Sequence, residues 1–263
     1  MSLLNVDTIE PEGATTVLTL GSATDTIKIP GGSAGADKVL TSDATGGATW
    51  AAASAGGLLG LVVYTNGGTY SPGDTDNGTA GDEGSASVTK VIIEVQGGGG
   101  GGGRGTGGTY VIGGSGGGYA KKFIDVSSMK TEAESATITV GAAGVGKATT
   151  SGAGGDAGDS SWVSTGEVNL TVTGVKGVGA YSSYGSAVGG DATNGDINIK
   201  GGDGVNSIPA RAGSSMLGSG GANGWVGETT PGTGRGYGSG GGGGYTTNGA
   251  DGAIGIVLIW EYA

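Results

Sequence analysis

The run Gly97-Gly98-Gly99-Gly100-Gly101-Gly102-Gly103 stands directly behind a strand-like stretch, Val88-Thr89-Lys90-Val91-Ile92-Ile93-Glu94-Val95-Gln96. Of the 67 glycines in the 263-residue chain, 16 lie in residues 1–96, which leaves 51 in residues 97–263. A glycine-rich chain loses much backbone entropy on folding and is usually disordered. Here, however, strand-like runs interrupt the glycine, and the chain closes on the apolar run 254–260, which is a liability if unpaired. The sequence therefore predicts that residues 97–263 fold with glycine in a structural role.

The glycine runs predict a bundle of polyglycine type II helices. This conformation has about three residues per turn and no internal hydrogen bonds. Every buried N–H and C=O must therefore bond to a neighbouring helix, and only glycine lets backbones approach closely enough. The runs that fit are 97–108, 113–118, 152–158, 185–190, 218–224 and 238–244.

Two further uses of glycine compete with this one. Collagen needs glycine at every third position with abundant proline, and a chain with five prolines and unbroken glycine runs does not fit. A calcium-binding β-roll is an alternative, because Gly154-Gly155-Asp156, Gly189-Gly190-Asp191 and Gly201-Gly202-Asp203 carry suitable residue types. These motifs are not spaced nine residues apart, so the polyglycine interpretation is favoured.

The rest of the pattern predicts an all-β chain in two domains. Strands are expected at 58–65, 87–96, 119–126, 136–141, 168–173, 196–200 and 253–261, in a β-sandwich-like or jelly-roll-like body. Residues 1–55 hold only short runs, at 5–9, 16–20 and 25–29, with few large apolar side chains. We expect residues 1–55 to form a trimerising shaft or collar, with a floppy tether as the alternative. Residues 56–263 would form a tip with strands to 96, polyglycine and loops over 97–252, and a closing strand over 253–262.

Composition excludes several function classes. The formal net charge is −11, and Lys121-Lys122 is the only adjacent basic pair, which argues against nucleic-acid or membrane partners. The chain has no Cys and no His, which removes the usual triads, proton shuttles and zinc sites. We therefore predict no enzyme activity, no cofactor and no metal site. Neither a signal peptide nor a membrane-spanning run is apparent.

Two acidic features compete with that prediction. The loop 74–83 resembles a calcium loop in its first five positions but lacks the Glu at the twelfth, so a solvated turn is favoured. A polysaccharide depolymerase would need paired carboxylates about 5–9 Å apart. The candidate carboxylates are Glu132, Glu134, Asp159, Asp203 and Glu228.

Several short motifs resemble the tail-fibre proteins of tailed bacteriophages. They are Leu4-Asn5-Val6-Asp7-Thr8-Ile9, Leu18-Thr19-Leu20-Gly21, Asp25-Thr26-Ile27, Ala36-Asp37-Lys38-Val39-Leu40-Thr41-Ser42-Asp43, Gly47-Ala48-Thr49-Trp50, Val62-Val63-Tyr64-Thr65, Val91-Ile92-Ile93-Glu94-Val95, Gly116-Gly117-Gly118-Tyr119-Ala120-Lys121-Lys122 and Gly255-Ile256-Val257-Leu258-Ile259-Trp260-Glu261-Tyr262. The resemblance implies a homotrimeric adhesin on the virion surface that binds a bacterial outer-membrane protein or polysaccharide. Its N-terminus would join other fibre or baseplate proteins. Residues 72–85 form an acidic insertion that the resemblance does not cover.

The predicted receptor-binding residues lie in loops between the polyglycine segments, where exposed aromatic and cationic side chains offer contact area at low entropy cost. They are Tyr181, Tyr184, Arg211, Trp225, Arg235, Tyr237 and Tyr245. Trp162 and Trp260 are expected in the core or sheets instead. Three further functions compete with a phage adhesin, namely a fibre-borne structural protein, an ice-binding protein and a bacterial surface adhesin of phage origin.

Overall fold

The computed structural model describes residues 38–42, 48–52, 57–72, 88–105, 112–127, 135–166, 168–180, 185–205, 211–222, 224 and 230–263. The prediction of an all-β chain is confirmed, since the described residues form antiparallel strands and no helix. Two compact units are present, Met1–Ser54 and Ala55–Ala263. Most of the first unit, including the predicted runs 5–9, 16–20 and 25–29, lies outside the described residues, as does most of the acidic insertion.

The first unit contains one described hairpin. Strand β1 (Lys38–Ser42) pairs with β2 (Ala48–Ala52) in an antiparallel register that places Leu40 opposite Trp50.

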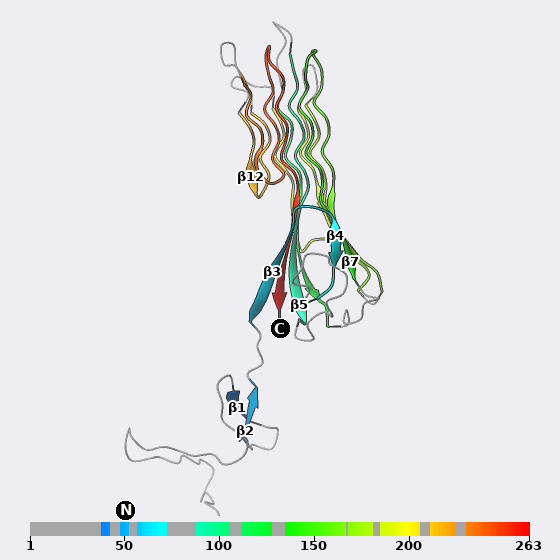
Figure 1. The fold of residues 1–263 in the computed structure, drawn as a ribbon, viewed down its shortest axis with the longest axis vertical. Helices are drawn as coiled ribbons and strands as arrows, with labels where there is room; N and C mark the ends of the chain where they lie inside the picture. The colour runs from blue at the N-terminus through cyan, green and yellow to red at the C-terminus, as the bar shows by residue number, and fades with distance from the viewer. Residues whose placement is uncertain are drawn as a thin grey trace, which may run out of the picture. The chain divides into compact units, whose positions relative to one another are not determined.

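The second unit is built on two five-stranded antiparallel sheets that share one core (Figure 1). In order across the first sheet, the strands are β11 (Ile197–Ile199), β6 (Tyr119–Asp125), β5 (Lys90–Gln96), β14 (Ile256–Tyr262) and β3 (Leu58–Tyr64). In order across the second sheet, they are β10 (Ala192–Thr193), β9 (Leu170–Gly174), β8 (Ser160–Ser164), β7 (Ala136–Thr139) and β4 (Gly68–Tyr70). The strands predicted near 58, 87, 119, 136, 168, 196 and 253 are thus present with shifted ends, whereas β8 was not expected.

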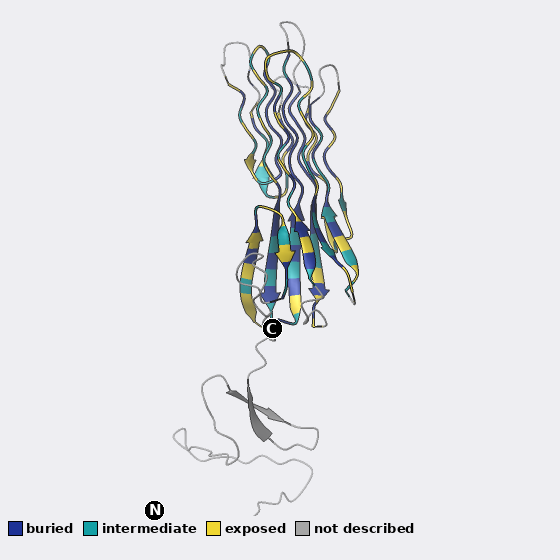
Figure 2. Cartoon of the chain, turned by 45° about the vertical axis from the view of Figure 1, so that its right-hand side comes forward, coloured by how far each residue is buried: buried dark blue, intermediate teal, exposed yellow. Residues whose placement is uncertain are grey.

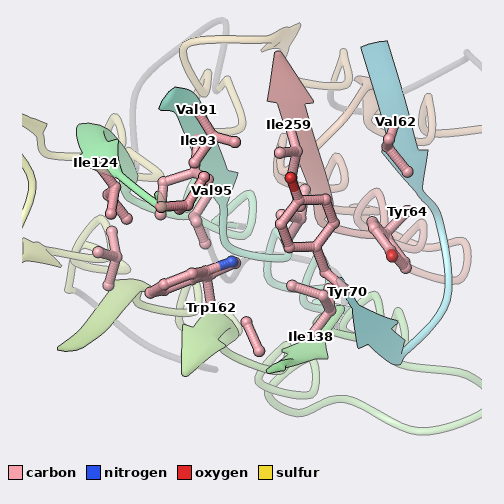
Figure 3. Packing of buried hydrophobic residues seen from close by; sticks show 14 of the residues in the cluster. Val62, Tyr64, Tyr70, Val91, Ile93, Val95, Ile124, Ile138, Trp162 and Ile259 are labelled. Atoms are coloured by element: carbon pink, nitrogen blue, oxygen red, sulfur yellow. The ribbon is translucent and has the colours of Figure 1, made fainter. Parts of the chain in front are cut away.

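The two-residue period of a strand decides which side chains face the core between these sheets. On β5, Val91, Ile93 and Val95 are fully buried, while the intervening Ile92 and Glu94 are half-buried. The second sheet contributes Tyr70, Ile138 and Trp162, which face the first sheet across the core (Figure 3). Trp162 on β8 is fully buried, as expected for a core tryptophan, and Trp260 lies on β14, as expected for a sheet residue.

The glycine-rich chain replaces the loops at one end of both sheets. After β5, β7, β9 and β11 the chain leaves along an extended segment and returns along another, and the segments run side by side beyond the sheets (Figure 1). We call this set the glycine-rich lattice. Its segments are 97–105, 112–118, 141–147, 152–158, 174–180, 185–191, 201–205, 211–215, 218–222 with 224, 230–234, 238–244 and 249–255.

The lattice has a sheet end and an outer end. Gly97 follows β5, Gly118 precedes β6 and Gly255 precedes β14, so these residues mark the sheet end. The described residues farthest along the segments, such as Gly103, Gly152 and Gly244, mark the outer end, where Gly103 donates to Ile112 at 3.1 Å and Gly244 donates to Gly103 at 2.9 Å. A small two-stranded sheet, β12 (Gly218–Ser219) with β13 (Arg235–Gly236), lies at the sheet end (Figure 1).

Candidate functional site at the outer end of the glycine-rich lattice

The segment 97–105 is the centre from which the lattice is built. From Gly97 to Arg104, its backbone N–H groups donate in a three-residue cycle to three neighbouring segments, and Gly105 donates to Gly244 at 2.9 Å. Gly97, Gly100 and Gly103 donate to segment 112–118; Gly98, Gly101 and Arg104 donate to segment 152–158; Gly99 and Gly102 donate to segment 249–255, all at 2.9–3.1 Å. All three acceptor segments run in the opposite direction, back toward the sheets. Each turn of the central segment is therefore bonded on three sides.

The carbonyl groups of the same segment accept from three further neighbours. Gly98 accepts from Gly177, Gly99 from Gly144 and Gly100 from Gly241, at 2.7–2.9 Å. These donors lie on segments that run in the same direction as 97–105. The central segment is thus enclosed by six others, and its glycines 97 to 103 are all buried (Figure 2).

This enclosure explains why the central run is all glycine. A Cβ on any of Gly97, Gly99, Gly100, Gly101 or Gly102 would stand under 3.0 Å from a backbone carbonyl of a neighbouring segment. Real Cβ atoms essentially never approach a neighbour so closely. Peripheral segments face the lattice on fewer sides and accept side chains at the remaining positions, such as the exposed Val145.

Carboxylates satisfy backbone donors at the rim of the lattice. Oδ1 of Asp156 accepts from Gly179 N at 2.9 Å, and Oδ1 of Asp203 accepts from Gly189 N at 2.8 Å. Asp159 and Asp251 accept in the same way from Lys176 N and Gly146 N, at 2.8 and 2.7 Å. Charge-assisted bonds of this kind are stronger than neutral ones. The Gly-Gly-Asp motifs around Asp156 and Asp203 therefore terminate the lattice, and among the described residues no cluster suits a metal ion.

A polar network fixes the chain turns at the outer end. Asn248 Oδ1 accepts from Arg104 Nη1 and from Thr149 N, the latter at 3.2 Å. Arg104 also donates from Nη2 to the carbonyl of Thr246 at 3.2 Å. Thr149 has φ of 61°, a left-handed conformation that is uncommon for a residue other than glycine. Asn248 thus joins the turn at 147–152, the turn at 244–249 and the end of the central segment.

Cationic side chains gather at this end of an acidic chain. Arg104, Lys147 and Arg211 all lie there, and none of them forms an ion pair with another described residue. Lys147 lies over Gly152, whose backbone is bonded to Arg104 in both directions at 2.9 and 3.0 Å. Arg211 is exposed and bridges Val205 and Ala222 through its backbone.

The structure divides the predicted receptor-binding residues between the two ends. Arg211 and the half-buried Tyr245 lie at the outer end. Arg235 and Tyr237 lie at the sheet end instead, because the chain turns there between 234 and 238, and Gly238 donates to Ile254 at 2.8 Å next to β14. Tyr181, Tyr184 and Trp225 lie outside the described residues.

The network residues Arg104, Thr149 and Asn248 were not among the predicted site residues. Arg104 carried a usable signal, since it ends the longest glycine run of the chain. The backbone-binding role of the aspartates was also missed, although each follows or precedes a glycine.

No protein-family model matches this chain, and a search of curated proteins finds no match. No helix among the described residues is long and apolar enough to cross a membrane.

Proposed function

We propose that this protein is a phage-type tail-fibre adhesin whose outer lattice end binds a receptor on a bacterial surface. The observation that carries the proposal is the joint placement of Arg104, Lys147, Arg211 and Tyr245 at one end of a stiff backbone lattice. A scaffold held by interior backbone hydrogen bonds positions surface turns without depending on their sequence. The short motifs resemble those of tail fibres, and this resemblance implies that the host is a bacterium and that the protein lies on the virion surface.

We further propose that the lattice segments are polyglycine type II helices. The three-residue cycle of donors along 97–104 supports this, because that conformation repeats every three residues. In the whole fibre, residues 1–55 would trimerise and join other fibre or baseplate proteins. Three tips on one fibre would then bind the cell with higher avidity than one tip alone.

The receptor is an outer-membrane protein or a polysaccharide. The cationic side chains at the outer end form no ion pair with any other residue that the structure describes, and they favour acidic groups on either receptor, such as the phosphates and uronates of bacterial surface glycans. Tyr245 would add a surface suited to stacking on sugar rings or to packing against a protein loop.

Binding of full-length protein to host cells, measured by flow cytometry, tests the proposal and the choice of end. Arg211→Ala combined with Tyr245→Ala is expected to weaken binding tenfold or more. Arg235→Ala combined with Tyr237→Ala changes the same residue types at the sheet end and is expected to leave binding unchanged. If only the sheet-end pair weakens binding, the site is at the other end, and if the wild-type protein binds no strain, the adhesin proposal fails.

A further inference from the structure

The outer face of the sheet β11-β6-β5-β14-β3 is apolar and, as far as the described residues show, partly exposed. The strand registers place Leu61, Trp260, Ile92 and Phe123 side by side in one row across four strands. Their neighbours along each strand, such as Val62 and Ile259, point into the core, so this row points outward. Leu61 is 44% exposed and Phe123 is 53% exposed.

The second sheet shows what a solvated outer face looks like in the same molecule. Its corresponding row is Thr69, Thr137, Val163 and Thr171, and the next is Thr139, Ser161, Thr173 and Thr193. Polar outer positions are the rule where an antiparallel sheet packs on one face and meets water on the other. The first sheet breaks that rule, and contiguous apolar patches on a protein surface mark interaction sites.

Charge on the apolar face is balanced, although the chain as a whole carries −11. Glu94 and Lys121 occupy adjacent outward positions and form an ion pair at 3.1 Å. Lys90 and Asp125 are likewise opposite each other in the register. Two copies of this face can therefore approach without the like-charge repulsion that the rest of the surface would impose.

Strand β3 is the part of the face that is most open to association with another chain. It is an edge strand of sequence Leu58-Leu59-Gly60-Leu61-Val62-Val63-Tyr64, and among the described residues only β14 pairs with it. Exposed apolar edges are templates for association unless something covers them.

We infer that this sheet face is where copies of the chain pack against one another, with the β3 edges nearest the common axis. A second copy fits better than a foreign partner because the face is self-neutral, with Glu94 paired to Lys121 and Lys90 opposite Asp125, in a chain that otherwise carries a net negative charge. The two-sheet bodies of the three chains in a fibre would then form one body rather than three separate tips. The inference rests on the proposed trimeric fibre for the number of copies.

The cysteine-free chain allows a direct test in the full-length protein. Leu61→Cys places a thiol on the edge strand of the apolar face, and Thr69→Cys places one on the exposed edge strand β4 of the other sheet. The Leu61→Cys thiol is expected to react with maleimide at least tenfold more slowly than the Thr69→Cys thiol, and at the same rate in denaturant. On prolonged incubation, which lets the slow reaction at the protected thiol go to completion, a short bismaleimide should link chains through Leu61→Cys but not through Thr69→Cys. Phe123→Cys, a second exposed position of the same row, should be protected as well.

Each combination of results decides whether copies of the chain pack through the apolar face. The mass of the protein in solution is measured in parallel by sedimentation. Protection and crosslinking in a protein of trimer mass support the inference. Trimer mass with equal reaction rates overturns it and leaves the trimeric fibre standing. Protection without crosslinks between chains also overturns it, because something other than a second copy then covers the face. Monomer mass overturns both the inference and the trimer, while cell binding still tests the adhesin proposal independently.

Discussion

Gly154 lies so close to the carbonyl group of Gly101 that a Cβ on Gly154 would stand under 3.0 Å from it. The next residue, Gly155, would bring its Cβ no nearer than 3.4 Å to the backbone of Val145. Two adjacent glycines of one segment therefore differ in whether a methyl group fits.

Gly154→Ala is expected to lower the free energy of unfolding by about 1–3 kcal/mol, because the segment must move away from the lattice centre. Gly155→Ala is expected to leave it unchanged or raise it by up to about 1 kcal/mol, since alanine restricts the unfolded chain. Chemical denaturation of the two variants beside the wild type checks this. Equal losses in both would mean that side-chain volume does not limit the lattice.

A second prediction concerns the carboxylates at the rim. Asp203→Ala removes the acceptor of the Gly189 N–H, and we expect a loss of about 1 kcal/mol and faster hydrogen exchange at that amide. Asp203→Asn keeps an oxygen in place and should recover most of the protection. Asp191→Ala removes an exposed carboxylate and should have no effect on the Gly189 amide. If all three variants exchange alike, the carboxylate does not hold this edge.

The network around Asn248 leads to a third prediction. Asn248→Ala removes the acceptor of both Arg104 and Thr149, so the turn at 147–152 is expected to exchange its amide hydrogens faster. The melting temperature should change little, because the backbone bonds of the lattice remain. Thr246→Ala is the control, since its contact with Arg104 uses the backbone carbonyl. Under the proposed function, Asn248→Ala also weakens cell binding, and an unchanged Thr149 amide would contradict the network.

The fourth prediction concerns alkaline pH. Burial, followed by the nearby Glu94 carboxylate and a hydrogen bond with it, raises the pKa of Tyr119 above its ordinary value of 10.0. The folded protein therefore keeps a proton that the unfolded chain releases as the pH rises past 10, so the free energy of unfolding falls over that range. Tyr119→Phe should show a smaller decline between pH 9 and pH 11 in thermal unfolding. Parallel declines in the two proteins would contradict the raised pKa.

Much of the sheet structure follows from the sequence. On β5 and β14 every second side chain is buried, because successive side chains of a strand point to opposite faces and one face packs into the core. Strand β8 was missed because Ser160, Ser161 and Ser164 surround its buried Trp162 and dilute the apolar pattern. Peripheral lattice segments such as 249–255 were missed for a different reason. Only one of their faces meets the interior, so glycine is required only at Gly249, Gly252 and Gly255, and the segment does not read as a glycine run.

The candidate site was less predictable than the fold. Sequence placed Arg211 and Arg235 in equivalent loops, yet the structure puts them at opposite ends of the lattice. Which end a turn occupies depends on how many segments precede it, and the turn at 234–238 was indistinguishable in composition from those at the outer end.

The carboxylates that close the rim have a consequence for solubility. A bundle held together by main-chain bonds has no inherent limit to its width, and an open flank would capture similar strands from other molecules. Asp156 and Asp203 occupy the very N–H groups that such a strand would need, and they leave a negative charge in its path. Alanine at both positions would leave these N–H groups open and remove the charge, which would favour lateral association between molecules.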